Sequence, residues 1–281
     1  MENYLNAKKK LFLQSDFALV NGDDIYTPQL IKGLECKIAK FGLDNEVNIT
    51  SSDVRTLGSY TEFKMYINKM LETIRVNIPG RFTAYNALAA IGVTSMLGCQ
   101  MDAILPALSE LKVPGRSESV DIGKTFSVVV DYAHTASSLE AILSSTKKYA
   151  KGRIICVFGC GGNRDKEKRE EMGKVAGKYA NFTVITTDNP RDENPKAIMD
   201  AIEKGVKSSN GLCTKIENRK EAIRFAMRIA WKSDIIIIAG KGHEKYQILK
   251  NNKKIPFDDV KVVKELAADF PEKDIQPQVA M

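Results

Sequence analysis

Four short loops contain most of the residues that could do chemistry. They comprise residues 131–134 (DYAH), 159–166 (GCGGNRDK), 188–191 (DNPR) and 240–244 (GKGHE), and both histidines of the chain lie in them. Glycines let backbone N–H groups converge on an anion. Arginine presents a planar fork that fits a carboxylate or a phosphate. These residue types therefore predict a site for a small charged ligand.

Three charged side chains in these loops are the ones from which we expect ligand contacts: Arg164, Arg191 and Glu244. Two guanidinium groups suit carboxylates and one glutamate suits an ammonium group, which favours an amino acid with an additional charged end. Each residue alone would more commonly be a solvated surface charge, so the prediction depends on their convergence. Asp131 and His134 could form a nucleotide-facing pair or a catalytic dyad, or His134 could simply pack at a helix N-terminus.

Several other catalytic motifs are missing from this sequence. It contains no GxSxG elbow of a serine hydrolase, and no GxGxxG opens its first strand–helix unit. Residues 123–125 (GKT) resemble the end of a P-loop, but the required earlier glycine would fall at Glu118 and the segment leads into a strand, so we expect a turn. The five cysteines form no CxxC pair. Reduced thiols and no structural zinc site are therefore expected.

The residues between the loops predict a regular alternation of strands and helices. Strands are expected at 127–132, 153–158, 182–186, 214–217 and 234–239, and helices at 137–149, 166–179, 195–207, 219–231 and 259–268. The strands are continuous apolar runs, which is typical of a parallel sheet buried on both faces. Ligands of such sheets bind at the carboxyl ends of the strands, where the four loops fall.

The first part of the chain gives a less regular pattern. Helices are expected at 3–14 and 84–97, the second ending at Gly98, and strands at 17–20, 36–41, 47–50 and 62–67. The turn-rich residues 112–116 (KVPGR) indicate a boundary, which gives domains at 1–112 and 113–281. The polar tail from Phe270 is expected to be loose.

The overall composition is that of a globular protein. The chain has 281 residues, of which 43% are hydrophobic and 27% charged. No run of 18 apolar residues predicts a membrane span, and the N-terminus does not resemble a signal peptide, so a cytoplasmic location is expected. The net charge of +7 favours an anionic partner. Because the lysines are spread without interleaved aromatic residues, we expect a phosphate-bearing small molecule and no nucleic acid.

Taken together, the four loops resemble the Mur ligase family, and within it the members that add diaminopimelate. The most specific segments are DYAHT at 131–135, FGCGGNRDKEKR at 158–169, DNPRDENP at 188–195 and AGKGHEKYQ at 239–247. The resemblance implies an α/β protein: a Rossmann-like C-terminal domain with a mostly parallel sheet, preceded by the second half of a central α/β ATPase domain. Met1 aligns with an internal position of the family, so neither the family's UDP-binding domain nor its P-loop is expected in this chain.

The resemblance also implies an activity. Members of the family form an amide through an acyl phosphate, with ATP and Mg²⁺ as cofactors. For this chain the implied partners are UDP-MurNAc-L-Ala-D-Glu and meso-diaminopimelate, used in peptidoglycan precursor synthesis, and a separate N-terminal half could act in trans. Three alternatives stay open: a non-catalytic amino-acid-binding module, an inert fragment, or a sister ligase that adds L-lysine or glutamate.

The family's nucleotide-side residues carry over position by position. Lys8 matches a lysine whose carbamate holds magnesium, and Arg116 matches an arginine that faces the ATP phosphates. The implied catalytic residues are Lys8, Arg116 and His134, and the implied nucleotide contacts are Asn86, Arg116, Asp131 and Tyr132.

The amino-acid pocket also carries over from the resemblance. It would comprise Arg164, Asp188, Asn189, Pro190, Arg191, Gly240 and Glu244. Lysine-adding relatives lack the arginine of DNPR, so Arg191 predicts diaminopimelate over lysine. Thr83, Ala136 and Val260 depart from the family pattern, and none of them belongs to this pocket.

Overall fold

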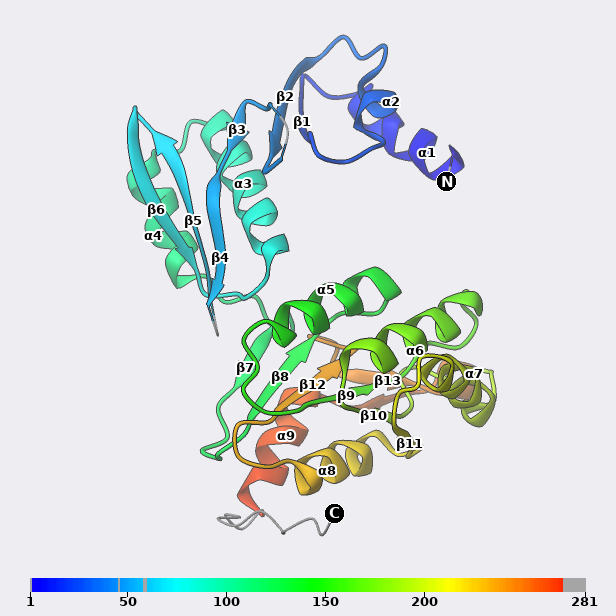
Figure 1. Cartoon of the computed structure of the whole chain (residues 1–281). Helices are drawn as coiled ribbons and strands as arrows, with labels where there is room; N and C mark the ends of the chain where they lie inside the picture. The colour runs from blue at the N-terminus through cyan, green and yellow to red at the C-terminus, as the bar shows by residue number, and fades with distance from the viewer. Residues whose placement is uncertain (1, 45, 58–59, 270–281) are drawn as a thin grey trace. The chain divides into compact units, whose positions relative to one another are not determined.

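The chain forms two compact units, Met1–Leu111 and Lys112–Met281. The computed structural model describes residues 2–44, 46–57 and 60–269 (Figure 1). The tail from Phe270, which the sequence predicts to be loose, lies outside the described residues.

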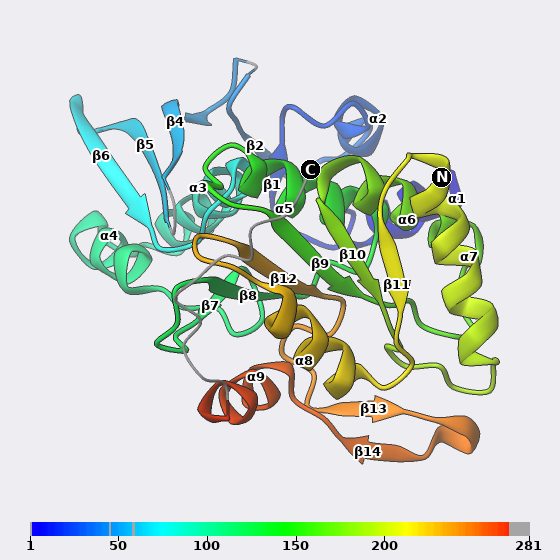
Figure 2. The same cartoon turned by 60° about the horizontal axis from the view of Figure 1, so that its bottom comes forward.

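A twisted sheet forms the centre of the second unit (Figure 2). Within residues 112–269 it has six strands in the order β11-β10-β9-β12-β8-β7, and all neighbours run parallel except β7 on β8. The strands are β7 (Glu118–Val120), β8 (Ser127–Asp131), β9 (Ile154–Phe158), β10 (Phe182–Ile185), β11 (Cys213–Lys215) and β12 (Ile235–Ala239). The mostly parallel α/β class predicted from the sequence is therefore confirmed.

Helices cover both faces of this sheet. One face carries α5 (Ala136–Lys147), α6 (Glu167–Tyr179) and α7 (Pro195–Ser208), and the other carries α8 (Arg219–Ile229) and α9 (Asp259–Ala268). Alternate residues of one strand enter different cores: Ile235 and Ile237 pack with α5–α7, whereas Ile236 and Ile238 pack with α8 and α9. Burial on both sides explains why the strands read as unbroken apolar runs. Each fully buried isoleucine stabilises the fold by about 1.5–3 kcal/mol.

The elements of this unit lie within about two residues of their predicted ranges. Residues 123–125, which imitate a P-loop, lie in a non-helical turn that leads into β8, as expected. The sequence did not predict β7 or the hairpin of β13 (Tyr246–Ile248) and β14 (Lys254–Pro256) with its short η1 turn (Lys250–Asn252). That hairpin contacts the DNPR loop, because Arg191 N donates to Ile248 O at 3.1 Å.

Two small sheets and four helices make up the described part of the first unit. Strands β1 (Phe17–Asn21), β2 (Lys37–Gly42) and β3 (Ile49–Thr50) are parallel, and β4 (Ser52–Leu57), β5 (Tyr60–Ile67) and β6 (Met70–Val76) form an antiparallel meander. The helices are α1 (Glu2–Phe12), α2 (Thr27–Ile31), α3 (Arg81–Met96) and α4 (Met101–Glu110). One core, with Phe63, Leu88 and Ile91 at its centre, joins the meander to α3 and α4.

The sequence predicted this unit less completely. The strand expected at 62–67 begins at Tyr60, and α3 begins at Arg81, three residues before the expected start. Gly98 follows α3 with a φ of 85°, as expected for a left-handed helix end. The sequence reading missed α2, α4, β4 and β6, and Pro106 inside α4 is a residue that ordinarily breaks a helix.

No helix in residues 2–44, 46–57 and 60–269 combines the length and apolar character needed to cross a lipid bilayer.

Candidate functional site

The candidate site is the set of loops that follow β9, β10 and β12. From β9 the chain continues outward to β10 and β11, and it then returns to place β12 on the opposite side of β9. Ligands of doubly wound sheets bind at such a switch point, beyond the carboxyl ends of the strands. Three of the four loops singled out in the sequence therefore lie where the topology predicts a ligand.

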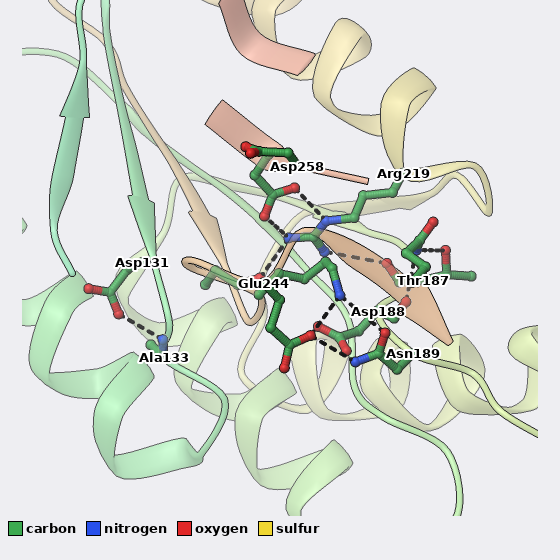
Figure 3. A network of polar contacts seen from close by, with 12 residues as sticks. Asp131, Ala133, Thr187, Asp188, Asn189, Arg219, Glu244 and Asp258 are labelled. Carbon is green, nitrogen blue, oxygen red and sulfur yellow. Dashed lines mark hydrogen bonds and ion pairs between the residues drawn. The ribbon is translucent and has the colours of Figure 1, made fainter. Parts of the chain in front are cut away.

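Asn189 connects two of these loops through its side chain (Figure 3). Its Nδ2 donates to Glu244 Oε2 at 3.1 Å, and its Oδ1 accepts from Lys241 Nζ at 3.1 Å and from Ile248 N at 2.9 Å. Lys241 Nζ also donates to Glu244 Oε2 at 2.9 Å, and the Lys241 side chain is fully buried. The DNPR loop and the GKGHE loop are thus joined by a charged network.

Glu244 is ionised and only partly paired in this network. Burial raises the pKa of its carboxyl, but the bonds from Lys241 and Asn189 outweigh burial and leave the pKa below its usual value. Both bonds use Oε2, and we find no partner of Oε1 in the described part of the chain. The carboxylate can therefore accept a further cation, such as an ammonium group.

Asp188 is a buried carboxyl group next to this pair. The residue is 8% exposed, and no hydrogen bond to its carboxyl oxygens is found among residues 2–44, 46–57 and 60–269. Burial raises its pKa, although Lys241 and Arg219 act in the opposite direction. A Cβ atom at Gly240 would lie 2.8 Å from Asp188 Oδ2, and Gly240 has a φ of 113°, so glycine is needed there. A buried carboxylate without a donor is costly, and a bound cation would relieve that cost.

Arg191 and Arg164 lie together beside the glycine-rich loop. Arg191 has a φ of 51°, and its Nη1 donates to Gly162 O at 2.9 Å and to Asn189 O at 3.5 Å. A Cβ atom at Gly161 would lie 2.9 Å from Arg191 Nη1 and 3.8 Å from Arg164 Cγ. The structure thus brings Arg164, Arg191 and Glu244 to one edge of the sheet, around Gly161 and Asn189.

Pro190 completes the contact between the two loops through its main chain. Gly162 packs so closely on it that a Cβ atom at this position would lie 1.9 Å from Pro190 O. Gly162 N also donates to Asn189 O at 2.9 Å. The glycines of the loop therefore let two strand ends approach, as a functional loop on a rigid sheet requires.

A second group of predicted residues gathers at the end of β8. The Arg116 guanidinium lies 4.5 Å from the centroid of the Tyr132 ring, and the ring centroids of His134 and His243 lie 4.6 and 5.2 Å from it. A cation and three rings arranged in this way offer flat surfaces that suit a nucleotide.

Asp131, at the end of β8, bonds to backbone N–H groups. Its Oδ2 accepts from Ser117 N at 2.7 Å. Its Oδ1 accepts from Ala133 N, also at 2.7 Å (Figure 3). Burial raises its pKa in spite of these bonds. His134 Nδ1 lies 2.8 Å from Tyr132 O instead. The two side chains therefore do not form the hydrogen-bonded dyad that the sequence left open.

Lys8 and Asn86 belong to the first unit. Lys8 is exposed on α1, with its Nζ 5.2 Å from the centroid of the Tyr4 ring, and Asn86 is exposed on α3. Within the described ranges, no three His, Cys, Asp or Glu side chains are arranged to hold a metal ion. These residues do not by themselves form a magnesium site, so the roles of Lys8 stay predictions.

Sequence reasoning missed three charged residues of this region: Lys241, Arg219 and Asp259. Arg219 occupies the first turn of α8, where a positive charge opposes the helix dipole. Such a placement is unfavourable unless another group compensates it, and it was the one available signal for Arg219. Lys241 gave no signal of its own, because a lysine in a glycine-rich loop is ordinarily exposed.

Comparison with known proteins agrees with this architecture. The model of the Mur ligase middle domain matches residues 1–94, and that of the Mur ligase, glutamate ligase domain matches residues 115–242. The UDP-N-acetylmuramoyl-L-alanyl-D-glutamate–2,6-diaminopimelate ligase of Caldanaerobacter subterraneus is 45% identical over 270 residues, which are 96% of this chain and 56% of that protein. The ligase of the same name from Alkaliphilus oremlandii is 42% identical over 272 residues, which are 95% of this chain and 56% of that protein.

Solved structures of Mur ligases and related ligases also match this chain over nearly its whole length. A structure of a ligase with this name matches with a TM-score of 0.61 and 31% identity, over 95% of this chain and 56% of the other. The pseudomurein peptide ligase type C of Methanothermus fervidus matches with a TM-score of 0.71 and 18% identity, over 95% and 59%, and shows the fold alone. This chain spans about half the length of the curated relatives that it matches. With both domain models matched in order and these relatives aligned along nearly all of it, the chain belongs to the Mur ligase family.

Proposed function

We propose that this chain carries the amino-acid-binding part of an ATP-dependent ligase that joins meso-diaminopimelate to UDP-MurNAc-L-Ala-D-Glu in peptidoglycan precursor synthesis. The observation that carries the proposal is the grouping of Arg164, Arg191 and Glu244 around Gly161 and Asn189. The printed names of the relatives at 42–45% identity include both substrates and support the same choice.

The charges at this edge of the sheet match those of the proposed amino acid. Diaminopimelate has a carboxylate and an amino group at each end. The guanidinium groups of Arg164 and Arg191 would take carboxylates, and Glu244 Oε1 would take an ammonium group, with Asp188 near it. Holding one end fixed would direct the amine of the other end towards the acyl phosphate, which it attacks as phosphate leaves. Positioning of this kind supplies a large part of the rate of such reactions.

The second carboxylate would distinguish diaminopimelate from lysine. L-lysine has no carboxylate at its side-chain end, so binding it would leave the Arg191 fork unpaired. An unpaired charged group of this kind costs roughly 2 kcal/mol or more. Because Arg191 Nη1 is fixed by Gly162 O, the fork cannot readily turn elsewhere. This argument favours a diaminopimelate-adding ligase over a lysine-adding one.

The nucleotide would contact the second group of residues. Mur ligases use ATP, and Arg116 with Tyr132 and His134 would lie against its phosphates and base. Asn86 and a carbamylated Lys8 would contribute from the first unit, with Lys8 as a magnesium ligand. Magnesium would neutralise charge on the phosphates. Asp131 would hold the turn at Ser117 in place, because both of its carboxyl oxygens already accept backbone N–H groups.

The complete reaction would take place in the cytoplasm, where ATP and UDP-linked precursors are available. The relatives are nearly twice as long as the matched segment, so the remaining parts of the ligase would come from the same polypeptide or from a separate N-terminal half.

An incorporation assay tests this proposal. The chain would be mixed with UDP-MurNAc-L-Ala-D-Glu, ATP, Mg²⁺ and labelled meso-diaminopimelate, with and without the purified N-terminal half of the Caldanaerobacter ligase. We expect label in the UDP-linked product when both halves are present. Equal incorporation of L-lysine would indicate the sister ligase. Binding of diaminopimelate without incorporation would indicate a binding module, and neither binding nor incorporation would contradict the proposal.

A further inference from the structure

A fully buried ion pair adjoins the candidate site. Arg219 Nε and Nη2 donate to Asp259 Oδ1 and Oδ2, both at 2.8 Å, and both side chains are 0% exposed. The same guanidinium donates to two main-chain carbonyls, from Nη2 to Ala239 O at 3.1 Å and from Nη1 to Thr187 O at 3.3 Å. Figure 3 shows the Arg219 side chain extending towards the loop that carries Thr187, Asp188 and Asn189. One side chain thus bonds to the residues that directly precede both loops of the network around Asn189.

These two carbonyls lie at the carboxyl ends of two strands that are not neighbours. Ala239 is the last residue of β12 and precedes Gly240, whereas Thr187 follows β10 and precedes Asp188. Strand β9 lies between β10 and β12, so no backbone ladder joins the two loops. The Arg219 guanidinium therefore bridges two loops whose separation the sheet fixes only indirectly.

Stability alone does not account for this arrangement. Burying an arginine and an aspartate carries a large desolvation cost, and apolar residues of similar volume often replace such a pair without loss of stability. Arg219 also opposes the dipole of α8. Burial lowers the pKa of Arg219, but the Asp259 carboxylate outweighs it and raises the pKa, so the arginine stays charged. A charged guanidinium is needed to donate to four acceptors at once.

The opposite end of the same sheet offers a contrasting ion pair. Arg153 Nη2 donates to Asp234 Oδ2 and to Ile229 O, both at 2.7 Å. This pair lies at the amino ends of β9 and β12, away from the candidate site, and its arginine side chain is 43% exposed. The pair connects the starts of β9 and β12, whereas Arg219 connects the carboxyl ends of β10 and β12. Arg153 therefore serves as a control at the other end of the same sheet.

We propose that Arg219 and Asp259 are positioning residues of the amino-acid site. Their ion pair sets the separation between Arg191 on the DNPR loop and Glu244 on the GKGHE loop. That separation decides how well one ligand reaches both a guanidinium group and a carboxylate. The inference rests on the proposed function for the identity of the ligand, but the fixing of the two loops can be measured without any ligand.

The test replaces the pair in the full chain by Arg219→Met with Asp259→Leu, which removes both charges and keeps most of the volume. Affinity for meso-diaminopimelate would be measured by calorimetry, and hydrogen exchange would be followed at residues 187–191, 240–244 and 154–158. We expect affinity to fall about tenfold or more and exchange in the two loops to rise by about the same factor, with β9 unchanged. The control Arg153→Met should leave affinity and loop exchange within about twofold of wild type.

A second variant covers the case in which the double variant does not fold. Arg219→Lys keeps the charge but cannot reach two carboxylate oxygens and two carbonyls together. Its loop exchange and affinity should change in the same direction by a smaller factor. Folded variants with wild-type loop exchange and wild-type affinity would overturn the inference. If the wild-type chain binds no diaminopimelate, the proposed function fails, and the exchange comparison alone then decides whether the pair positions the loops.

Discussion

The two units differ in how much of their sheet is covered. In the second unit every residue of β9 and β12 is buried, because helices pack on both faces. In the first unit β1 has two buried residues and β2 has one. Several of its large apolar residues are more than half exposed: Tyr4, Leu11, Leu13, Phe17 and Ile25 near its start, and Tyr66, Met70 and Leu97 further along. An open depression of about 720 Å³ lies among Phe12, Leu13, Phe17 and neighbouring residues.

This difference bears on where a precise site can form. The loops around Asn189 are attached to strands with a core on each side, and their charged side chains bond to one another. Lys8 and Asn86 lie on exposed surfaces of helices in the first unit. A site is held accurately when its supporting residues are packed. All residues of the proposed amino-acid site therefore belong to the second unit, whereas the proposed nucleotide contacts include residues of the first unit.

Hydrogen exchange should show the largest contrast between the units. Local opening free energies range from near zero to that of global unfolding, and they follow burial. We expect amides of β9 and β12 to exchange about a thousandfold more slowly than those of β1 and β2, which corresponds to about 4 kcal/mol. Mass spectrometry of deuterium uptake in the full chain would measure this. Equal protection of the two sets of strands would contradict the comparison.

Substitutions in the two units should affect amino-acid binding unequally. Arg191→Ala removes the guanidinium proposed to pair with a carboxylate, and it should weaken meso-diaminopimelate binding by about 30-fold, or roughly 2 kcal/mol. Lys8→Ala, in the first unit, should leave that affinity unchanged. Calorimetry without ATP would compare the two variants. A loss of similar size for both would show that the site is not confined to the second unit.

The smallest effect is expected for Asp188→Asn, and it concerns the free energy of unfolding. Burial holds the folded-state pKa of Asp188 above the ordinary value of 3.8 for an aspartate. Wild-type stability should therefore fall as the pH rises from 3.8 through the folded-state pKa, because the unfolded chain releases its proton first. Asp188→Asn has no carboxyl group to ionise, so it does not lose stability in this way. Its free energy of unfolding at pH 8 should exceed that of the wild type by about 1 kcal/mol. Urea unfolding followed by fluorescence of Trp231, the single tryptophan, would report the second unit.

Asp192 provides the control for that prediction in the same loop. Its pKa is lowered by bonds from Asn251 N and the Asn163 side chain, so its contribution to stability is present at neutral pH and is lost as the pH falls. Asp192→Asn should therefore destabilise the second unit at neutral pH. A change of the same sign in both Asn variants would contradict the assignment of Asp188 as a strained carboxyl group.

The sequence predicted most of the second unit because its patterns are local and strong. Unbroken apolar runs marked the strands, and glycine, proline and charged residues marked the loops between them. The first unit was harder, since β4 and β6 mix polar and apolar residues and α4 contains Pro106. Its half-exposed elements carry a weaker periodic signal than a buried sheet does.

The residues of the candidate site also differ in how far the sequence could predict them. The loops that hold Arg164, Arg191 and Glu244 could be identified from short motifs, and the topology explains why they meet. The pairing of Arg219 with Asp259 spans 40 residues, and no local pattern predicts such a contact. Nor could the hydrogen bonding of Asp131 be predicted, because it depends on backbone N–H groups at Ser117 and Ala133.

The most direct test of the central claim is a calorimetric comparison of meso-diaminopimelate with L-lysine on the unmodified chain. Two guanidinium groups and one partly paired carboxylate at one sheet edge predict that diaminopimelate binds at least about tenfold more tightly. Equal affinities, or tighter binding of lysine, would contradict the role assigned to Arg191. If the folded chain bound neither compound, the second unit would not hold the amino-acid site proposed for it.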